Sequence, residues 1–121
     1  MSTSLYYTAT RATALSEDEH QQLMALARGH NDAFEFDGET LYFYPAQRDN
    51  EVLNGSTKIC PDPVEMAPSL LHWLAALTAL RQALPEAQWD VSLDEIDVPW
   101  DEHRGYHLPG LEDLAAMHEG Y

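Results

Sequence analysis

The segment Phe34-Glu35-Phe36-Asp37-Gly38-Glu39-Thr40-Leu41-Tyr42-Phe43-Tyr44 carries the strongest local signal for the fold. Its Asp37-Gly38 pair is typical of a two-residue hairpin loop, because both residues tolerate the positive φ angles of such a turn. The turn sets a register in which the hydrophobic side chains of the two flanking strands share one face. We therefore expect an antiparallel hairpin with Phe34, Phe36, Leu41 and Phe43 on its buried face and Glu35, Tyr42 and Tyr44 on its open face.

A strand and a helix are expected before this hairpin. Hydrophobic and polar residues alternate from Leu5 to Arg11, which predicts a strand. Ser16 and Glu19 then form a capping-box pattern, in which Ser16 caps a helix and Glu19 reaches back to it. The helix should end at about Arg28, because Gly29 is a typical helix stop.

A second, smaller hairpin is expected after the hairpin at Asp37-Gly38. Asn54-Gly55 is another turn signal, and it lies between the short stretches Glu51–Leu53 and Ser56–Cys60. Such a turn would set Glu51 opposite Lys58. We interpret this hairpin as an insertion into the main fold.

A long helix and a last strand complete the regular part of the chain. Pro68 suits the first position of the helix and would be costly deeper inside it, and Pro85 should end it. Alternation from Gln88 to Glu95 predicts the strand. The helix should bury Leu70, Trp73, Leu74, Leu77, Leu80 and Leu84, and the strand Trp89, Val91 and Leu93.

The expected element order is strand, helix, strand, strand, helix, strand. This order resembles a ferredoxin-like βαββαβ sandwich, an α+β fold with two helices on one face of an antiparallel sheet. Residues 1–121 are expected to form a single domain. The segment Ile96–Tyr121 exceeds this minimal fold, and we expect it to be irregular around Trp100–Pro109 with a short helix from about Leu111 to Met117.

The charge balance of the chain narrows the range of partners. The chain has 21 Asp and Glu residues against 6 Lys and Arg residues, a formal net charge of −15. Its cations are scattered singly, so direct binding to nucleic acid or to an anionic membrane is not expected. A strongly acidic surface favours association with basic proteins. Acidity also keeps proteins soluble, so solubility alone is a competing explanation.

Cysteine usage and short motifs indicate the compartment and the cofactors. Cys60 is the single cysteine, so an intrachain disulfide is excluded. The first residues lack the basic region and apolar stretch of a signal peptide. Neither of the glycine patterns G-x-G-x-x-G and G-x-x-x-x-G-K occurs. We therefore expect a cytoplasmic bacterial protein without a cofactor.

The sheet face that the two helices leave open is the candidate functional site. It would combine carboxylates with tyrosines, which are favoured at protein interfaces because they add contact area at low entropic cost. This combination predicts a non-catalytic module that docks a basic protein partner. In size and charge the chain resembles immunity proteins paired with toxins and acidic inhibitors that imitate nucleic acid. The expected partner-binding residues are Tyr6, Glu35, Tyr42, Tyr44, Asp90, Asp94, Trp100, Asp101 and Glu102.

Three alternatives remain open for this face. The C-terminal segment, with Trp100, Tyr106 and Leu108, would cover it as ordinary packing. Two copies of the chain would form a homodimer through it. A small enzyme or ligand-binding protein would have its site between the sheet and the C-terminal segment. The residues of that last site would be Tyr42, Tyr44, Asp94, Trp100 and His103.

Titratable groups crowd the segment Asp97–His107. An H-x₃-H pair needs a helix to bring both rings to one side, and Gly105 and Pro109 disfavour a helix here. We interpret the segment as a polar surface loop and expect no metal. His72, in the long helix, is expected at the edge of the core. The candidate metal ligands or acid–base groups in the segment are Asp101, Glu102, His103 and His107.

Overall fold

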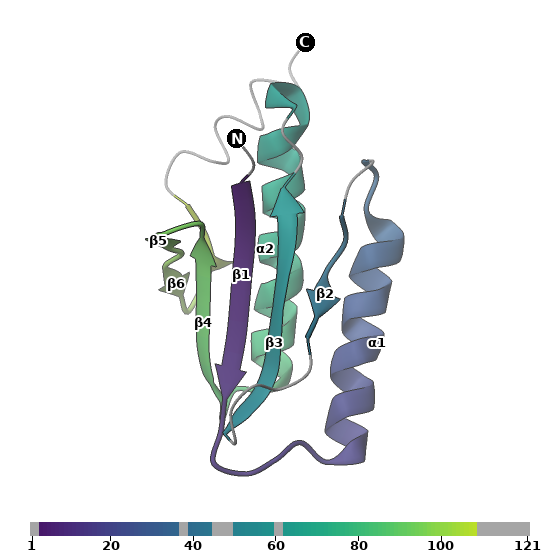
Figure 1. Ribbon diagram of the computed structural model, residues 1–121, viewed down its shortest axis with the longest axis vertical. Coiled ribbons are helices and arrows are strands. Elements are labelled where there is room, and N and C mark those ends of the chain that lie inside the picture. Colours follow the sequence, from purple (N-terminus) through teal and green to yellow (C-terminus); the bar gives the residue numbers. More distant parts are fainter. Residues whose placement is uncertain (1–2, 37–38, 45–49, 60–61, 109–121) are drawn as a thin grey trace.

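The computed structural model describes residues 3–36, 39–44, 50–59 and 62–108. In this part of the chain, two helices pack on an antiparallel sheet, which makes the protein an α+β structure (Figure 1). The elements in chain order are β1 (Thr3–Thr10), α1 (Glu17–Ala33), β2 (Tyr42–Phe43), β3 (Glu51–Ile59), α2 (Pro63–Ala83), β4 (Gln88–Leu93), β5 (Ile96–Asp97), β6 (Trp100–Asp101) and β7 (Gly105–Tyr106).

The main sheet has the strand order β2-β3-β1-β4-β5. The central strand β1 pairs antiparallel with β3 on one side and with β4 on the other. The outer strands β2 and β5 pair antiparallel with β3 and β4. It follows that β1 and β2 run in the same direction with β3 between them. Strands β6 and β7 form a separate two-stranded sheet.

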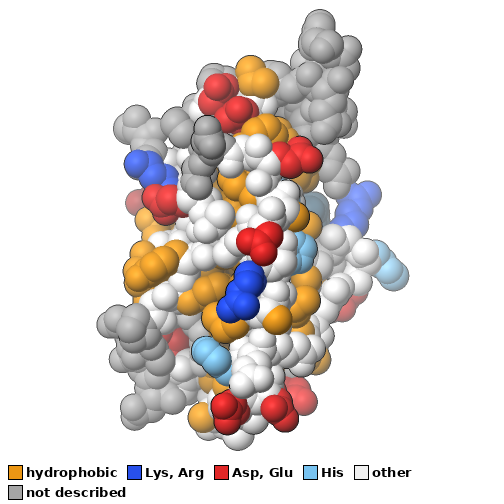
Figure 2. All heavy atoms as spheres, turned by 90° about the vertical axis from the view of Figure 1, so that its right-hand side faces the viewer, with side chains coloured by type: hydrophobic (Ala, Val, Ile, Leu, Met, Phe, Trp, Pro, Cys, Tyr) orange, Lys and Arg blue, Asp and Glu red, His pale blue; other side chains and the backbone are white. Residues whose placement is uncertain are grey.

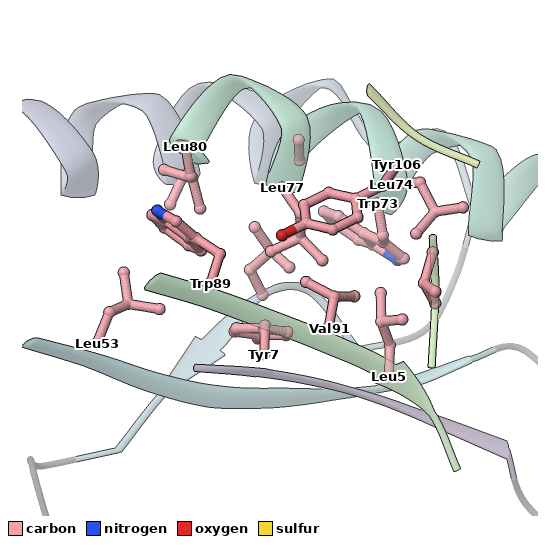
Figure 3. Close-up of a cluster of buried hydrophobic side chains, with 14 of the residues drawn as sticks. Leu5, Tyr7, Leu53, Trp73, Leu74, Leu77, Leu80, Trp89, Val91 and Tyr106 are labelled. Carbon is pink, nitrogen blue, oxygen red and sulfur yellow. The ribbon is translucent and has the colours of Figure 1, made fainter. Parts of the chain in front are cut away.

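The core lies between α2 and one face of the main sheet. The predicted alternation of β1 is confirmed, because Leu5, Tyr7 and Ala9 are fully buried. Figure 3 shows the side chains of Leu77 and Leu80 reaching from α2 toward those of the strands. Other predicted core residues that are buried are Leu70, Trp73, Leu74, Leu84, Trp89 and Val91.

Helix α1 begins as predicted but ends later. Both hydrogen bonds of the capping box between Ser16 and Glu19 are present. The prediction that Gly29 stops the helix is wrong, because α1 continues to Ala33. The extra turn is held by contacts that outweigh the roughly 1 kcal/mol cost of a glycine inside a helix. The carbonyl oxygen of His30 lies 2.7 Å from Nε2 of His72, and the Asn31 side chain bonds both backbone groups of Leu41.

The prediction of a hairpin around Asp37-Gly38 is wrong, because its first strand does not form. Phe34 is the C-cap of α1, and residues 34–36 form no strand. The ring of Phe34 instead packs on Trp73 of α2, with ring centroids 4.5 Å apart. Strand β2 pairs with β3. The residues Asp37 and Gly38 lie outside the described part of the chain.

The extra hairpin at Asn54-Gly55 is also wrong, because both residues lie inside the continuous strand β3. Glu51 faces Thr10 and not Lys58. Gly55 has a packing role: a Cβ atom there would overlap the carbonyl oxygen of Tyr42 and the ring of Tyr7. Glycine therefore marks a close approach between chain segments and not a turn. Cys60 lies outside the described residues.

The Tyr7 side chain links three strands beneath Gly55. It starts on β1, passes under β3 and reaches the backbone of β2. Its hydroxyl donates to the carbonyl oxygen of Tyr42 at 2.7 Å and accepts from the Tyr42 N–H at 2.9 Å. The Thr57 hydroxyl lies 2.9 Å away. Burial raises the pKa of Tyr7 to about 12, so the hydroxyl keeps its proton at neutral pH.

Helix α2 begins earlier than predicted. Asp62 is its N-cap and accepts a hydrogen bond from Val64 N–H, while Pro68 lies inside the helix and not at its first position. The end is as expected, with Leu84 as C-cap directly before Pro85. His72 is partly buried at the edge of the core. None of the helices in the described part of the chain has the length and apolarity needed to cross a membrane.

The C-terminal segment packs on α2. Tyr106 is buried, and its N–H donates to Oγ1 of Thr78 at 3.0 Å. Gly105 has a φ of +79° and lies so close to Thr78 that a Cβ would overlap it. The guanidinium of Arg81 lies 4.1 Å from the ring centroid of Trp100. The expected irregular region thus contains β6 and β7, and the expected helix from Leu111 to Met117 lies outside the described residues.

Candidate functional site

The face of the sheet opposite the helices carries three exposed tyrosines. Tyr6 is 46% exposed, Tyr42 57% and Tyr44 45%. Directly paired residues point to the same side of a sheet, so the strand register defines a row of side chains across this face. We call this surface the open face. The row runs through Tyr42, Ser56, Tyr6, Ser92 and Asp97.

Two of the tyrosines hold each other in place. The rings of Tyr42 and Tyr44 meet edge to face, with centroids 4.9 Å apart. The hydroxyl of Tyr44 lies 2.7 Å from that of Ser56 on β3, and the Tyr44 N–H donates to the Asn54 carbonyl. These contacts restrict the two rings before any partner arrives, which lowers the entropic cost of binding through them.

Carboxylates border the tyrosines on the β4 side of the open face. Asp90 is exposed and paired with Thr8 of β1. Asp94 is exposed in the turn after β4, has a φ of 53°, and accepts a hydrogen bond from Ser4 N–H at 3.0 Å. Within strands β1–β5, Lys58 is the only Lys or Arg. The open face is therefore predominantly acidic.

Two hollows lie on the described part of the open face. Tyr6, Asp94, Glu95 and Ile96 line the hollow beside β4 and β5. The hollow beside β2 lies on the other side of β3. Each hollow combines a tyrosine ring with at least one carboxylate. The residues that line the second hollow are Glu39, Thr40, Leu41, Tyr42, Tyr44 and Ser56.

The acids at the start of α1 have structural roles. Figure 2 shows the side of the molecule where α1 lies, with acidic side chains at the lower end, where this helix begins. Glu17, Asp18 and Glu19 occupy its first turn, where negative charge stabilises the helix dipole. Glu19 also binds Arg11 through both carboxylate oxygens, each at 2.9 Å. Asp90 and Asp97 have no comparable position at a helix start.

The structure places five of the nine predicted partner-binding residues on the open face, spread between its β2 and β4 sides. Glu35 is exposed but follows α1 outside the sheet. The Trp100 ring lies against the Arg81 guanidinium and meets the Tyr106 ring edge to face at α2, and its Nε1–H donates to Glu102 at 3.2 Å. Asp101 and Glu102 therefore lie beside the helix layer as well. The residues that share the open face are Tyr6, Tyr42, Tyr44, Asp90 and Asp94.

The site proposed for an enzyme or ligand-binding protein is not assembled. Tyr42 lies at the β2 edge of the open face, and Asp94 follows β4 near the opposite edge. Trp100 lies in the helix layer. The segment Trp100–Leu108 thus packs on α2 and does not cover the open face, whereas Ile96 and Asp97 of β5 extend the sheet beside β4.

The titratable segment forms a turn. The Asp101 carboxylate accepts hydrogen bonds from the backbone N–H groups of His103, at 2.7 Å, and Arg104, at 3.0 Å. These hydrogen bonds lower the pKa of Asp101. Within the described residues, no three His, Cys, Asp or Glu side chains are close enough together to hold a metal ion.

Sequence reasoning missed Ser56, Asp97 and Glu39 as residues of the open face. Ser56 was missed because β3 was interpreted as a hairpin. The alternation of Leu53, Thr57 and Ile59 with polar residues was a signal for one continuous strand. Comparisons with protein-family models, curated proteins and solved structures found no match for this chain.

Proposed function

We propose that this chain is an acidic, non-catalytic protein-binding module that docks a basic protein partner on its open face. The observation that carries the proposal is the row of exposed tyrosines beside Asp90 and Asp94. Tyrosine supplies contact area at low entropic cost, and carboxylates steer a basic partner toward it. By analogy of size and charge alone, we compare the chain with small acidic immunity proteins and acidic inhibitors.

We also propose that the fold is of the ferredoxin-like type. Its support is the strand order β4-β1-β3-β2 within the sheet, together with the parallel orientation of β1 and β2 around β3. In this arrangement the helices cover one face, and the other face is free for binding. Strand β5 and the segment after it are additions at the β4 edge.

Binding should depend on the position of the acids and not on net charge alone. The test pair is Asp90→Asn with Asp97→Asn, which removes two charges from the open face. The matched control is Asp32→Asn with Glu35→Gln, which removes two exposed charges outside the sheet. Both pairs change the net charge equally, so they separate local from general electrostatics.

The experiment captures partners from the native host with the wild-type chain and with both double variants as bait. A purified basic partner is then titrated against all three chains over a salt series. We expect the Kd to rise with salt and the open-face variant to bind about tenfold or more weakly, while the control binds almost normally. Equal binding by the two variants would refute the proposal.

Homodimerisation through the open face is the competing outcome. A second copy would bring its own carboxylates against those of the first, and this repulsion disfavours pairing at low salt. Sedimentation over a concentration series measures it directly. If the wild-type chain forms a tight dimer and Tyr6→Ser dissociates it, the open face is a homodimer interface and the docking proposal is wrong.

A further inference from the structure

We infer that the two hollows of the open face each receive one arginine side chain, so that the partner presents two arginines about 10 Å apart. This inference rests on the proposed docking of a basic partner and specifies how that partner is recognised. It follows from the residues that line the hollows and from their separation across β3.

The hollow beside β4 and β5 has the chemistry of a guanidinium site. The Tyr6 ring forms one wall and the carboxylates of Asp94 and Glu95 another. A guanidinium is planar, so it can stack on an aromatic ring while two of its N–H groups donate parallel hydrogen bonds to a carboxylate. Asp94 is already anchored by its hydrogen bond from Ser4 N–H, which fixes the carboxylate in position.

The hollow beside β2 repeats this combination with different residues. The edge-to-face rings of Tyr42 and Tyr44 form its aromatic wall, and Glu39 supplies the carboxylate. Glu39 is anchored as Asp94 is, because its Oε1 accepts the Lys58 N–H at 3.2 Å. Both hollows thus pair an aromatic ring with a carboxylate that the backbone holds in place.

The separation of the hollows follows from the sheet. Tyr42 on β2 and Tyr6 on β1 lie in the same row with Ser56 of β3 between them. The hollow beside β4 lies between Tyr6 of β1 and Asp94 after β4, and the hollow beside β2 lies between Tyr42 of β2 and Ser56 of β3. The midpoints of these two strand pairs are two strand spacings of about 4.8 Å apart, so the hollows are about 10 Å apart across the sheet. On a helix, residues i and i+7 lie on one face and are separated by roughly 10.5 Å. A helix with arginines at this spacing therefore fits both hollows.

The test uses alanine-rich helical peptides that carry two arginines at i,i+4, at i,i+7 or at i,i+11. All three have the same charge, and a peptide with one arginine serves as reference. Binding to the ¹⁵N-labelled full chain is followed by NMR. We expect the i,i+7 peptide to bind about fivefold or more tightly than the other two, and lysine in place of arginine to weaken it.

Two variants locate the binding. Tyr6→Ser and Tyr42→Ser should each remove the preference for i,i+7 and reduce its affinity to that of the single-arginine peptide. The pair Asp32→Asn with Glu35→Gln should keep the preference. The same affinity for all three spacings, or no binding by any peptide, would overturn the two-arginine inference. Neither result decides the docking proposal, because that proposal is tested separately with the natural partner and the Asp90 and Asp97 variants.

Discussion

The hydroxyl of Tyr7 is the group whose removal tests the core of the structure most directly. Tyr7→Phe deletes one oxygen atom and keeps the ring that passes under Gly55. The oxygen makes hydrogen bonds to the carbonyl and N–H of Tyr42 and to the Thr57 hydroxyl. The matched control is Tyr6→Phe, because Tyr6 directly precedes Tyr7 in the same strand but lies on the open face.

The expected loss can be worked out from these contacts. An intramolecular hydrogen bond contributes about 1 kcal/mol net, and a buried group left unpaired costs about 1–3 kcal/mol. Thr57 is fully buried and has a further hydrogen bond to the Thr40 carbonyl, which limits its loss. We expect Tyr7→Phe to lower the free energy of unfolding by about 2–4 kcal/mol. Tyr6→Phe should change it by less than about 0.5 kcal/mol.

Urea unfolding followed by circular dichroism measures these changes, and alkaline pH provides a second readout. The pKa of Tyr7 is raised from 10.0 to about 12 in the folded protein, mainly by burial. The folded state therefore holds this proton more tightly than the unfolded chain. Its contribution is full below the unfolded pKa of 10.0 and is lost as the pH rises toward about 12.

Tyr7→Phe should therefore flatten the fall in stability between these two pH values more than Tyr6→Phe does. If Tyr7→Phe and Tyr6→Phe had the same urea midpoint and the same alkaline slope, the interpretation of Tyr7 as a link between three strands would be refuted.

Three further predictions concern single side chains. Gly55→Ala should destabilise the protein by about 3 kcal/mol or more in urea unfolding, because the added methyl overlaps Tyr7 and the β2 backbone; a change below about 1 kcal/mol would contradict the close approach. The hydrogen bonds from Arg11 lower the pKa of Glu19 to about 2, so its stabilisation is full above the ordinary 4.5 and is lost as the pH falls. Glu19→Gln should flatten this acid limb in pH-dependent unfolding more than Glu17→Gln, which removes a charge from the same helix turn but no partner of Arg11. The buried hydroxyl of Ser69 has no hydrogen-bond partner among the described residues. Ser69→Ala should therefore raise the free energy of unfolding by about 1 kcal/mol, which a higher urea midpoint would show. A lower midpoint would contradict this expectation.

Periodicity and capping predicted the elements whose signals are local. The burial pattern of β1 and the Ser16 capping box follow from residues close in sequence, and the structure confirms them. In β4 the predicted burial is confirmed for Trp89 and Val91, whereas Leu93 is only partly buried. The interpretation of Gly55 as a turn failed because the reason for that glycine is Tyr7, 48 residues away in the chain. Close approach between distant segments has no signature in local sequence.

Only those residues of the open face that a local pattern places could be predicted from the sequence. Alternation placed Tyr6 and Asp90 on it, and both lie there. Glu35 was misplaced because the end of α1 depends on contacts with α2, which no local pattern reveals. Trp100 was placed over the sheet, whereas its stacking with Arg81 draws it toward the helix layer.

The hydrogen bonds between Asn31 and Leu41 have a consequence for how copies of this chain behave at high concentration. The Asn31 side-chain amide accepts from the Leu41 N–H at 3.0 Å and approaches its carbonyl with Nδ2 at 3.4 Å. It thus occupies the donor and acceptor that an incoming strand would use beside β2. An occupied sheet edge resists the strand-to-strand growth that leads to aggregation. We therefore expect this one amide to disfavour the pairing of a second copy along the start of β2.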